Sequence, residues 1–404
     1  MLRRVALIGT TLLVAVPATA WAVIADWNSR IDTAEITDQL GTARPTSRAA
    51  AVSTPDPADP FDGRPLNVAV FGSDSRDGDN GKLTDHASAG IRSDVTMIVH
   101  VSAARDRIDI VSIPRDTTVT IPTCTLSDGT ENGLPWTTKF NAAFSRGGEH
   151  GNIGDAAACS IKTLEEVTDV RIDQFVVVDF SGFVSMIDAL GGVDMKITHD
   201  MSSTKAKLDI TKGTQILDGK TALAFARART GQGLGDGSDL SRLDRQHQLV
   251  SAVAKSVTKR NLLTSTPALY SFVNAVTDSL TTSPELGSVQ TIAGLAFSLR
   301  HTKPSAGTAV TAPNDGDPND PAKVFRTAEA QEVFDALAED RPLPANVTGA
   351  DDADPSASAS PAPSSSRASS HPSSSRPSAY RLTDADSAGE SVLADGGPVG
   401  RRVP

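Results

Sequence analysis

The sequence is poor in aromatic residues and in positive charge. Phe, Trp and Tyr make up only 4% of the 404 residues, which argues against a protein that binds single-stranded nucleic acid by stacking. The formal net charge is −11, so few phosphates could be neutralised and we expect no nucleic-acid partner. Hydrophobic residues reach 39%, which is enough for a sizeable core.

The usual catalytic motifs are also missing. The chain has no GxSxG elbow, no P-loop and no HExxH motif, and its seven histidines are scattered, so we expect no histidine-based zinc site. Arg outnumbers Lys by 26 to 12 and Ala is abundant, a composition typical of GC-rich genomes such as those of actinobacteria.

Only two cysteines are present, Cys124 and Cys159. They form no CxxC motif and have no histidine cluster near them, which favours a structural disulfide over a metal or redox site. Such a pair normally oxidises outside the cytoplasm, so the disulfide prediction goes together with export.

The N-terminus carries a hydrophobic run. Residues 5–25 are uncharged and follow Arg3 and Arg4, and about 20 apolar residues suffice for a helix to span a bilayer. The positive-inside rule then predicts a single-pass cell-membrane protein whose C-terminal bulk is extracytoplasmic. A cleaved signal peptide is the alternative, since Ala18 and Ala20 belong to A-x-A-like sites.

Composition divides the chain into six parts. We expect a cytoplasmic N-terminus (1–4), a transmembrane signal-anchor (5–25), a stalk or linker (26–62), a catalytic domain (63–260), a C-terminal extension packed on it (261–345) and a tail (346–404). Residues 355–379 hold 12 Ser and 5 Pro, too few apolar groups to offset the entropy of ordering, so the tail is predicted to be disordered.

The middle of the chain alternates between strand and helix patterns. Apolar runs predict strands at 66–72, 94–101, 107–113, 172–180 and 193–197, the second and third forming an antiparallel hairpin. Helices are predicted from Asp155, over 183–190, after Asp218 and after Ser238 or Asp239. This order indicates an α/β fold with a mixed sheet covered by helices on both faces.

Asp74 and Asp94 each stand at a strand end. Antiparallel neighbours would bring the end of one strand near the start of the next, and two carboxylates with phosphate oxygens commonly hold Mg²⁺. Two surface aspartates in turns are the alternative.

Several arginines lie near predicted apolar faces. Arg227 and Arg229 end one helix, and Arg242 and Gln246 of the next overlap its apolar stripe, so they point toward the interior. Arg is rarely placed so unless it meets an anion, which favours a phosphate or pyrophosphate site. Internal pairing is the alternative, with Asp116, Asp239 and Asp244 as candidate partners.

Seven sequence blocks in order resemble the LytR-CpsA-Psr (LCP) family. They are residues 66–76, 92–94, 112–116, 139–144, 175–180 with 190–193, 223–229 and 239–246, so the resemblance covers about residues 66–259. It implies a three-layer α-β-α fold with a mixed central sheet. It also implies an extracytoplasmic phosphotransferase that moves a glycopolymer from a polyprenyl-pyrophosphate carrier to a peptidoglycan hydroxyl.

The resemblance also implies roles for individual residues. Asp74 and Asp94 would hold Mg²⁺, and the polyprenyl chain would occupy an apolar tunnel between sheet and helices. The pyrophosphate would meet Arg76, Arg92, Arg115, Lys139, Arg227, Arg229, Arg242 and Gln246. Catalysis would involve Asp94, Arg115, Asp116 and Arg227, with either Asp94 or Asp116 as the base for the acceptor hydroxyl.

Two other functions remain open at this point. The same site could hydrolyse a polyprenyl-pyrophosphate-linked substrate, with water as the acceptor. A non-catalytic wall-binding or regulatory protein is the second alternative. The loop between Asp74 and Arg92 is long and rich in Gly and Asp, a departure from the family pattern that bears on the metal site.

Overall fold

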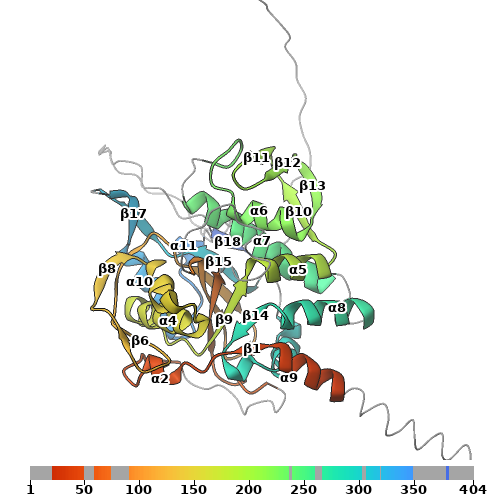
Figure 1. Cartoon of the computed structure of the whole chain (residues 1–404). Helices are drawn as coiled ribbons and strands as arrows, with labels where there is room; N and C mark the ends of the chain where they lie inside the picture. Colours follow the sequence, from red (N-terminus) through yellow and green to blue (C-terminus); the bar gives the residue numbers. More distant parts are fainter. Residues whose placement is uncertain are drawn as a thin grey trace, which may run out of the picture.

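The computed structural model of the chain is built around an eight-stranded sheet (Figure 1). It describes residues 21–49, 59–73, 91–235, 239–259, 266–302, 306–318, 320–348 and 379–381. From one edge to the other the strands are β1 (Asp32–Thr33), β14 (Leu280–Thr282), β9 (Gln174–Asp179), β2 (Leu66–Ser73), β3 (Ser93–Val101), β4 (Ile108–Ser112), β15 (Thr308–Thr311) and β18 (Ala379–Arg381). Because β2 is parallel to β9 but antiparallel to β3, the sheet is mixed, as predicted.

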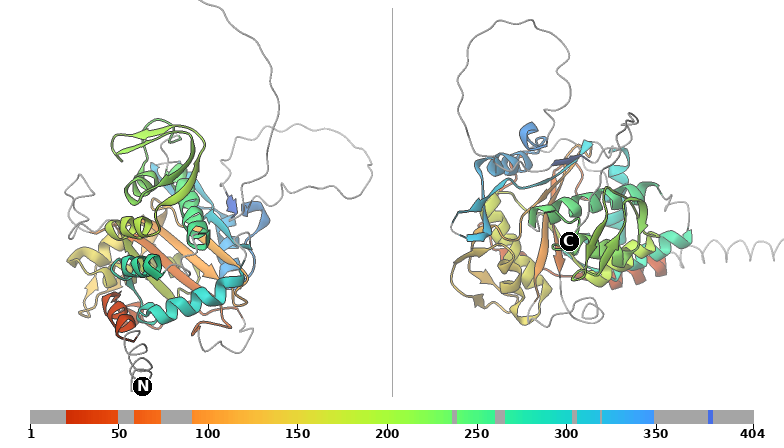
Figure 2. Two further views of the ribbon diagram at one scale, coloured as in Figure 1. Left: turned by 90° about the vertical axis from the view of Figure 1, so that its right-hand side faces the viewer. Right: turned by 90° about the horizontal axis from the view of Figure 1, so that it is seen from above.

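Helices lie on both sides of this sheet (Figure 2). One side carries α2 (Thr37–Leu40), α3 (Ala142–Gly147), α4 (Ile153–Thr168) and α10 (Ala328–Ala338). The other carries α5 (Phe180–Ala189), α6 (Gly219–Arg227), α7 (Asp239–Lys259), α8 (Thr266–Thr277) and α9 (Val289–Ser298).

Short two-stranded ribbons project from this framework. They pair β5 (Thr118–Ile121) with β8 (Trp136–Lys139), β6 (Cys124–Thr125) with β7 (Glu131–Asn132), β10 (Val193–Ile197) with β13 (Gly213–Leu217), β11 (Met201–Ser203) with β12 (Leu208–Ile210), and β16 (Asn314–Asp317) with β17 (Asp320–Arg326). The predicted strand over 193–197 therefore forms in place, but pairs with β13 outside the central sheet.

The two faces of the sheet are buried to different extents. Toward α4 and α10, side chains such as Ala69, Phe71 and Ile98 are fully buried in one large cluster. Toward α7 and α9, many central valines are only partly buried; they are Val70, Val95, Val99 and Val176. The second face is thus apolar but incompletely covered.

Most predicted elements form with shifted ends. The 94–101 and 107–113 segments make the expected antiparallel hairpin, β3 with β4. α4 starts at Ile153, before the predicted Asp155, because the Asn152 side chain accepts the Asp155 amide and caps the helix. Asp218 caps α6 as predicted, accepting the Thr221 amide at 2.8 Å.

Three expected boundaries need correction. The described part of the 26–62 segment is no free stalk, because β1 pairs with β14 and Phe61 is buried under the sheet. Part of the 261–345 extension enters the central sheet as β14 and β15. Within the tail, where we expected disorder, Ala379–Arg381 forms β18 along β15.

The predicted membrane anchor falls largely outside the described residues. Residues 21–30 are helical, and the Trp27 ring of this helix packs in a tilted arrangement against Tyr270 of α8, with 5.6 Å between ring centroids. Within the described ranges, which begin at residue 21, no helix combines the length and hydropathy needed to cross a bilayer.

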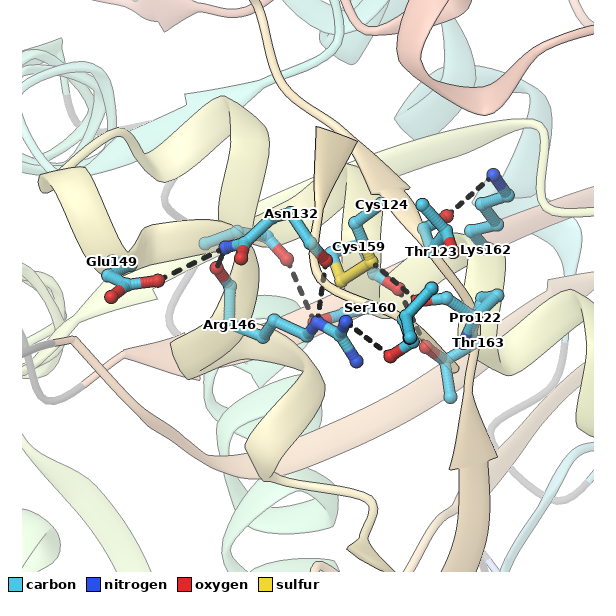
Figure 3. The surroundings of a disulfide bond; sticks show 12 residues. Pro122, Thr123, Cys124, Asn132, Arg146, Glu149, Cys159, Ser160, Lys162 and Thr163 are labelled. Carbon is cyan, nitrogen blue, oxygen red and sulfur yellow. Dashed lines mark hydrogen bonds between the residues drawn. A yellow bond between two sulfur atoms is a disulfide. The ribbon is translucent and has the colours of Figure 1, made fainter. Parts of the chain in front are cut away.

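The predicted disulfide between Cys124 and Cys159 is confirmed (Figure 3). It joins β6 to α4 across 35 positions of sequence, and both cysteines are buried. The bond therefore fastens the β5–β8 region to the helical layer that covers one face of the sheet.

Candidate active site

The site lies at the ends of three neighbouring strands in the middle of the sheet, where β2 and β4 end and β3 begins. Ser73 of β2 pairs with Ser93 of β3, after a register shift at Gly72. Asp94 follows directly, and Arg115 comes three positions after the end of β4 at Ser112. Asp74 and Arg76, predicted as a metal ligand and a pyrophosphate contact, lie outside the described residues.

Asp94 is shared by two guanidinium groups. Arg115 Nη1 donates to Asp94 Oδ1 at 2.5 Å, while Arg242 donates to the Asp94 carbonyl at 3.0 Å and lies 3.8 Å from its carboxylate. Burial raises the pKa of the Asp94 carboxyl, but the charges of Arg115 and Arg242 outweigh it and hold the pKa below its usual value. Asp94 is therefore ionised at neutral pH.

A second group of cations lies around the Asp116 carboxylate. Lys139 Nζ donates to Asp116 at 2.9 Å, and guanidinium nitrogens of Arg115 and Arg229 lie 3.6 and 3.8 Å from the same carboxylate. Arg115 thus bridges the two aspartates. Four basic side chains therefore converge on the carboxylates of Asp94 and Asp116.

Three more residues of the predicted pyrophosphate site lie on α6 and α7; they are Arg227, Arg242 and Gln246. The Arg227 guanidinium lies 4.5 Å above the Phe180 ring, a cation–π contact, and Gln246 donates to the Ala226 carbonyl at 3.2 Å. Arg242 and Gln246 are 2% and 5% exposed, so the prediction that they point inward is confirmed.

A buried hydrogen bond ties α7 to the sheet beside the site. Ser112 Oγ and His247 Nε2 lie 2.7 Å apart, and burial lowers the pKa of His247 to about 4. The imidazole is consequently neutral at pH 7. Because Ser112 ends β4, this bond fixes the helix that carries Arg242 relative to the loop that carries Arg115.

A cavity of about 640 Å³ opens next to Asp116. Its lining includes three of the predicted basic residues, Arg92, Arg115 and Lys139, together with residues that sequence reasoning did not single out. The latter are Trp136, Thr138, Asn141, Ala142, Ser145, Arg146 and Glu149. Asn141 belongs to a sequence block that carries the family resemblance, which was the one available signal for it.

The two hypotheses for the arginines are both partly met. Arg115 and Arg242 are paired internally, as the alternative required, but their shared partner is Asp94, which was predicted as a metal ligand. Of the partners considered for the alternative, Asp116 pairs with basic residues of the site. The arginines are thus internally paired and still converge at one place, as a phosphate site requires.

The described residues contain one of the two predicted metal ligands. Across these residues, no group of three or more His, Cys, Asp or Glu side chains is placed to hold a metal ion. Asp94 is nevertheless ionised, with 36% of its side chain exposed, and Asp74 follows directly on Ser73. These oxygens suit a hard cation whose remaining ligands come from phosphate and water.

Comparison with protein families gives one clear match. The model of the LytR_cpsA_psr family covers residues 23–339. The chain is 33% identical over 202 residues to the probable cell wall biosynthesis protein LcpB of Corynebacterium glutamicum, covering 49% of this chain and 43% of that protein. The source of this relative agrees with the actinobacterial origin that the composition suggested.

A second relative carries a more specific name. The polyisoprenyl-teichoic acid–peptidoglycan teichoic acid transferase TagT of Bacillus subtilis is 31% identical over 221 residues, covering 53% of this chain and 59% of TagT. The chain therefore matches about half of the length of these curated relatives. Among solved structures, a LytR-Csp2A-Psr enzyme from Actinomyces oris superposes with a TM-score of 0.51 at 18% identity, over 74% of this chain and 97% of that one.

Proposed function

Because the chain belongs to the LytR_cpsA_psr family, we propose that it is a membrane-anchored phosphotransferase of cell wall biogenesis. Its donor is a glycopolymer on a polyprenyl-pyrophosphate carrier, and its acceptor is a hydroxyl of peptidoglycan. The relatives' names support the class of reaction, and the geometry of this chain's own site supports the roles of its residues.

The observation that carries the proposal is the convergence of basic side chains at the ends of the central strands. Arg115, Lys139, Arg229 and Arg242, here called the cation cluster, all lie within 4 Å of a carboxylate of Asp94 or Asp116. A group with several negative oxygens, such as a pyrophosphate, would interact with several of these cations at once. Arg suits this role because its fork of donors matches phosphate oxygens.

The incompletely covered sheet face supports a lipid carrier. Val70, Val95, Val99 and Val176 are apolar, central in the sheet and only partly buried, and β3 leads from this face to Asp94. An isoprenoid chain lying between this face and α7 would remove their remaining surface from water, which is favourable. Its pyrophosphate would then meet the cation cluster.

The reaction requires positioning and charge neutralisation more than covalent chemistry. The acceptor hydroxyl oxygen forms a bond to the phosphorus next to the glycopolymer, and the bond from that phosphorus to the bridging oxygen breaks. Polyprenyl phosphate leaves with the bridging oxygen, while the hydroxyl proton passes to a base. Arg115 and Arg242 stabilise the charge that grows on the leaving phosphate.

The proton acceptor we propose is Asp94 or Asp116. Each is already paired with basic groups, so each would act as a weak base whose orientation is fixed by those partners. Mg²⁺ held by Asp74 and Asp94 would supply further neutralisation of pyrophosphate charge. Addition of EDTA, followed by Mg²⁺, tests this part of the proposal separately.

A donor-consumption assay tests the function. The full chain in liposomes is given a polyprenyl-pyrophosphate-linked glycopolymer, and release of polyprenyl phosphate is followed with and without peptidoglycan. Peptidoglycan-dependent release supports the transferase, equal release without it supports the hydrolase, and no release supports a non-catalytic protein. Arg115→Ala should lower the rate about 100-fold or more. Arg300→Ala is the matched control, because Arg300 is an exposed arginine that lies over the Phe297 ring and has no proposed role in the reaction.

A further inference from the structure

Trp136 occupies an unusual position on its ribbon. In the β5–β8 pairing it stands opposite Ile121, and Thr138 stands opposite Val119. Directly paired residues share a face of the ribbon, so Trp136 lies on the face whose β5 side chains belong to the core. Ile121 and Val119 are buried there, yet Trp136 is 55% exposed and lines the 640 Å³ cavity.

The segment that presents this indole is held rigidly. Arg146 of α3 donates to the carbonyls of Asn132 and Leu134 at 2.9 and 2.6 Å. The Asn132 side chain donates back to the Arg146 carbonyl at 2.5 Å (Figure 3). Gly133 has φ +66°, and a Cβ there would lie 2.3 Å from Arg146 Nη2. The positive φ therefore favours glycine where the chain turns toward Trp136.

The disulfide adds a second attachment. Cys124 of β6 pairs with Asn132 of β7, and Cys159 joins β6 to α4. The turn before Trp136 is thus fixed to α3 through Arg146 and to α4 through the disulfide. An exposed aromatic on so rigid a support loses little conformational entropy when a ligand covers it.

We propose that this cavity is the acceptor subsite, in which a hexopyranose ring of the peptidoglycan glycan strand stacks on the Trp136 indole. The inference rests on the proposed function and deepens it. The C–H face of a sugar ring is weakly positive and apolar, which complements the negative face of an aromatic ring. Asn141, Ser145 and Glu149 supply hydrogen-bonding groups for the ring's hydroxyl and amide substituents.

The position of the cavity suits an acceptor. Lys139 and Arg115 line it and also contact Asp116, so a sugar on Trp136 has the cation cluster at its side. A hydroxyl of that sugar would face the pyrophosphate bound by the same cations. The lipid carrier, by contrast, is proposed to lie along the sheet face toward α7.

Kinetics of the full chain in liposomes test the assignment. Trp136→Ala should raise the KM for peptidoglycan about tenfold, the size of one stacking contact, and leave the KM for the donor within about twofold. Trp136→Phe should recover most of the loss. Leu134→Ala, on the same turn and 83% exposed, is the matched control and should change neither value.

Binding without turnover tests it independently of the reaction. With Trp21 and Trp27 replaced by Phe, Trp136 is the last tryptophan, and a soluble glycan fragment of peptidoglycan should change its fluorescence saturably. Unchanged fluorescence, or a rise in donor KM alone, would overturn the acceptor assignment. Glycan binding in a chain that transfers nothing would contradict the proposed function but keep the subsite.

Discussion

At the residue scale, the site depends on how Asp94 is shared. Arg242 is almost completely buried, and Arg115 links Asp94 to Asp116. Buried guanidinium groups need a charge partner or a bound anion. Asp94 serves as that partner while no substrate is bound, and a pyrophosphate can take over the role.

Replacing Asp94 tests this sharing. Asp94→Asn should lower the free energy of unfolding by about 1–3 kcal/mol, less than for a fully buried pair because Asp94 is partly exposed. Inorganic pyrophosphate should raise the melting temperature of the variant more than that of the parent chain. Asp209→Asn, at an exposed position of β12, is the control. Equal melting temperatures and equal responses to pyrophosphate would contradict the account.

A second aspartate predicts a pH dependence of stability. Burial raises the pKa of Asp244 to about 6, although the charge of Arg245 opposes the shift. Since the folded protein binds this proton more tightly than the unfolded chain, the associated stability is present below about pH 4 and lost as the pH rises through 6. Asp244→Asn should therefore melt higher than the parent above pH 6 and equally at pH 4. A difference that is constant from pH 4 to 8 would argue against it.

At the element scale, the central strands could be predicted because their apolar runs are continuous and end in turn residues. The short strands could not. β15 has four residues and pairs in parallel with β4, roughly 200 positions earlier, so no local sequence pattern predicts this strand. Likewise β1, with two residues, is held by β14 far along the chain.

Part of the candidate site could also be predicted from the sequence. Arg242 and Gln246 were identifiable because a polar residue within an apolar helical stripe stands out. Trp136 and Arg146 were not, because their importance depends on the pairing of β5 with β8 and on the turn at Gly133. Asp94 was expected to bind a metal, and its contacts with two arginines could only be seen in three dimensions.

The disulfide gives a prediction about the β5–β8 region. Exchanging both Cys124 and Cys159 for Ser should lower the free energy of unfolding by about 2–4 kcal/mol, because the closed loop constrains the unfolded chain. Calorimetry of the variant should match that of the parent chain melted in reductant. If neither treatment changed the melting temperature, the disulfide would have no structural role.

At the scale of the whole molecule, we expect the N-terminal segment to fix the chain to the membrane. The helix at 21–30 packs against α8 through Trp27, which donates to Asn274 at 2.8 Å. The folded part would therefore lie close to the bilayer that residues 5–25 are proposed to span. Such an arrangement suits an enzyme whose donor is a membrane lipid.

Fractionation of cells expressing the full chain tests this arrangement. The protein should remain in the membrane fraction after alkaline carbonate extraction, and protease added from outside should digest the domain. Removing residues 1–20 should release it into the soluble fraction. Recovery of the protein in soluble form, with a new N-terminus after Ala20 or Ala22, would show a cleaved signal peptide instead.

The central claim is that the chain transfers the glycopolymer as a phosphodiester onto peptidoglycan. The most direct measurement is mass spectrometry of muramidase-digested peptidoglycan after reaction with a defined polyprenyl-pyrophosphate-linked glycan, together with the amount of polyprenyl phosphate released. The account predicts a glycan joined through one phosphate to a peptidoglycan sugar, in equal amount to the polyprenyl phosphate. Polyprenyl phosphate accompanied only by free glycan phosphate would contradict it.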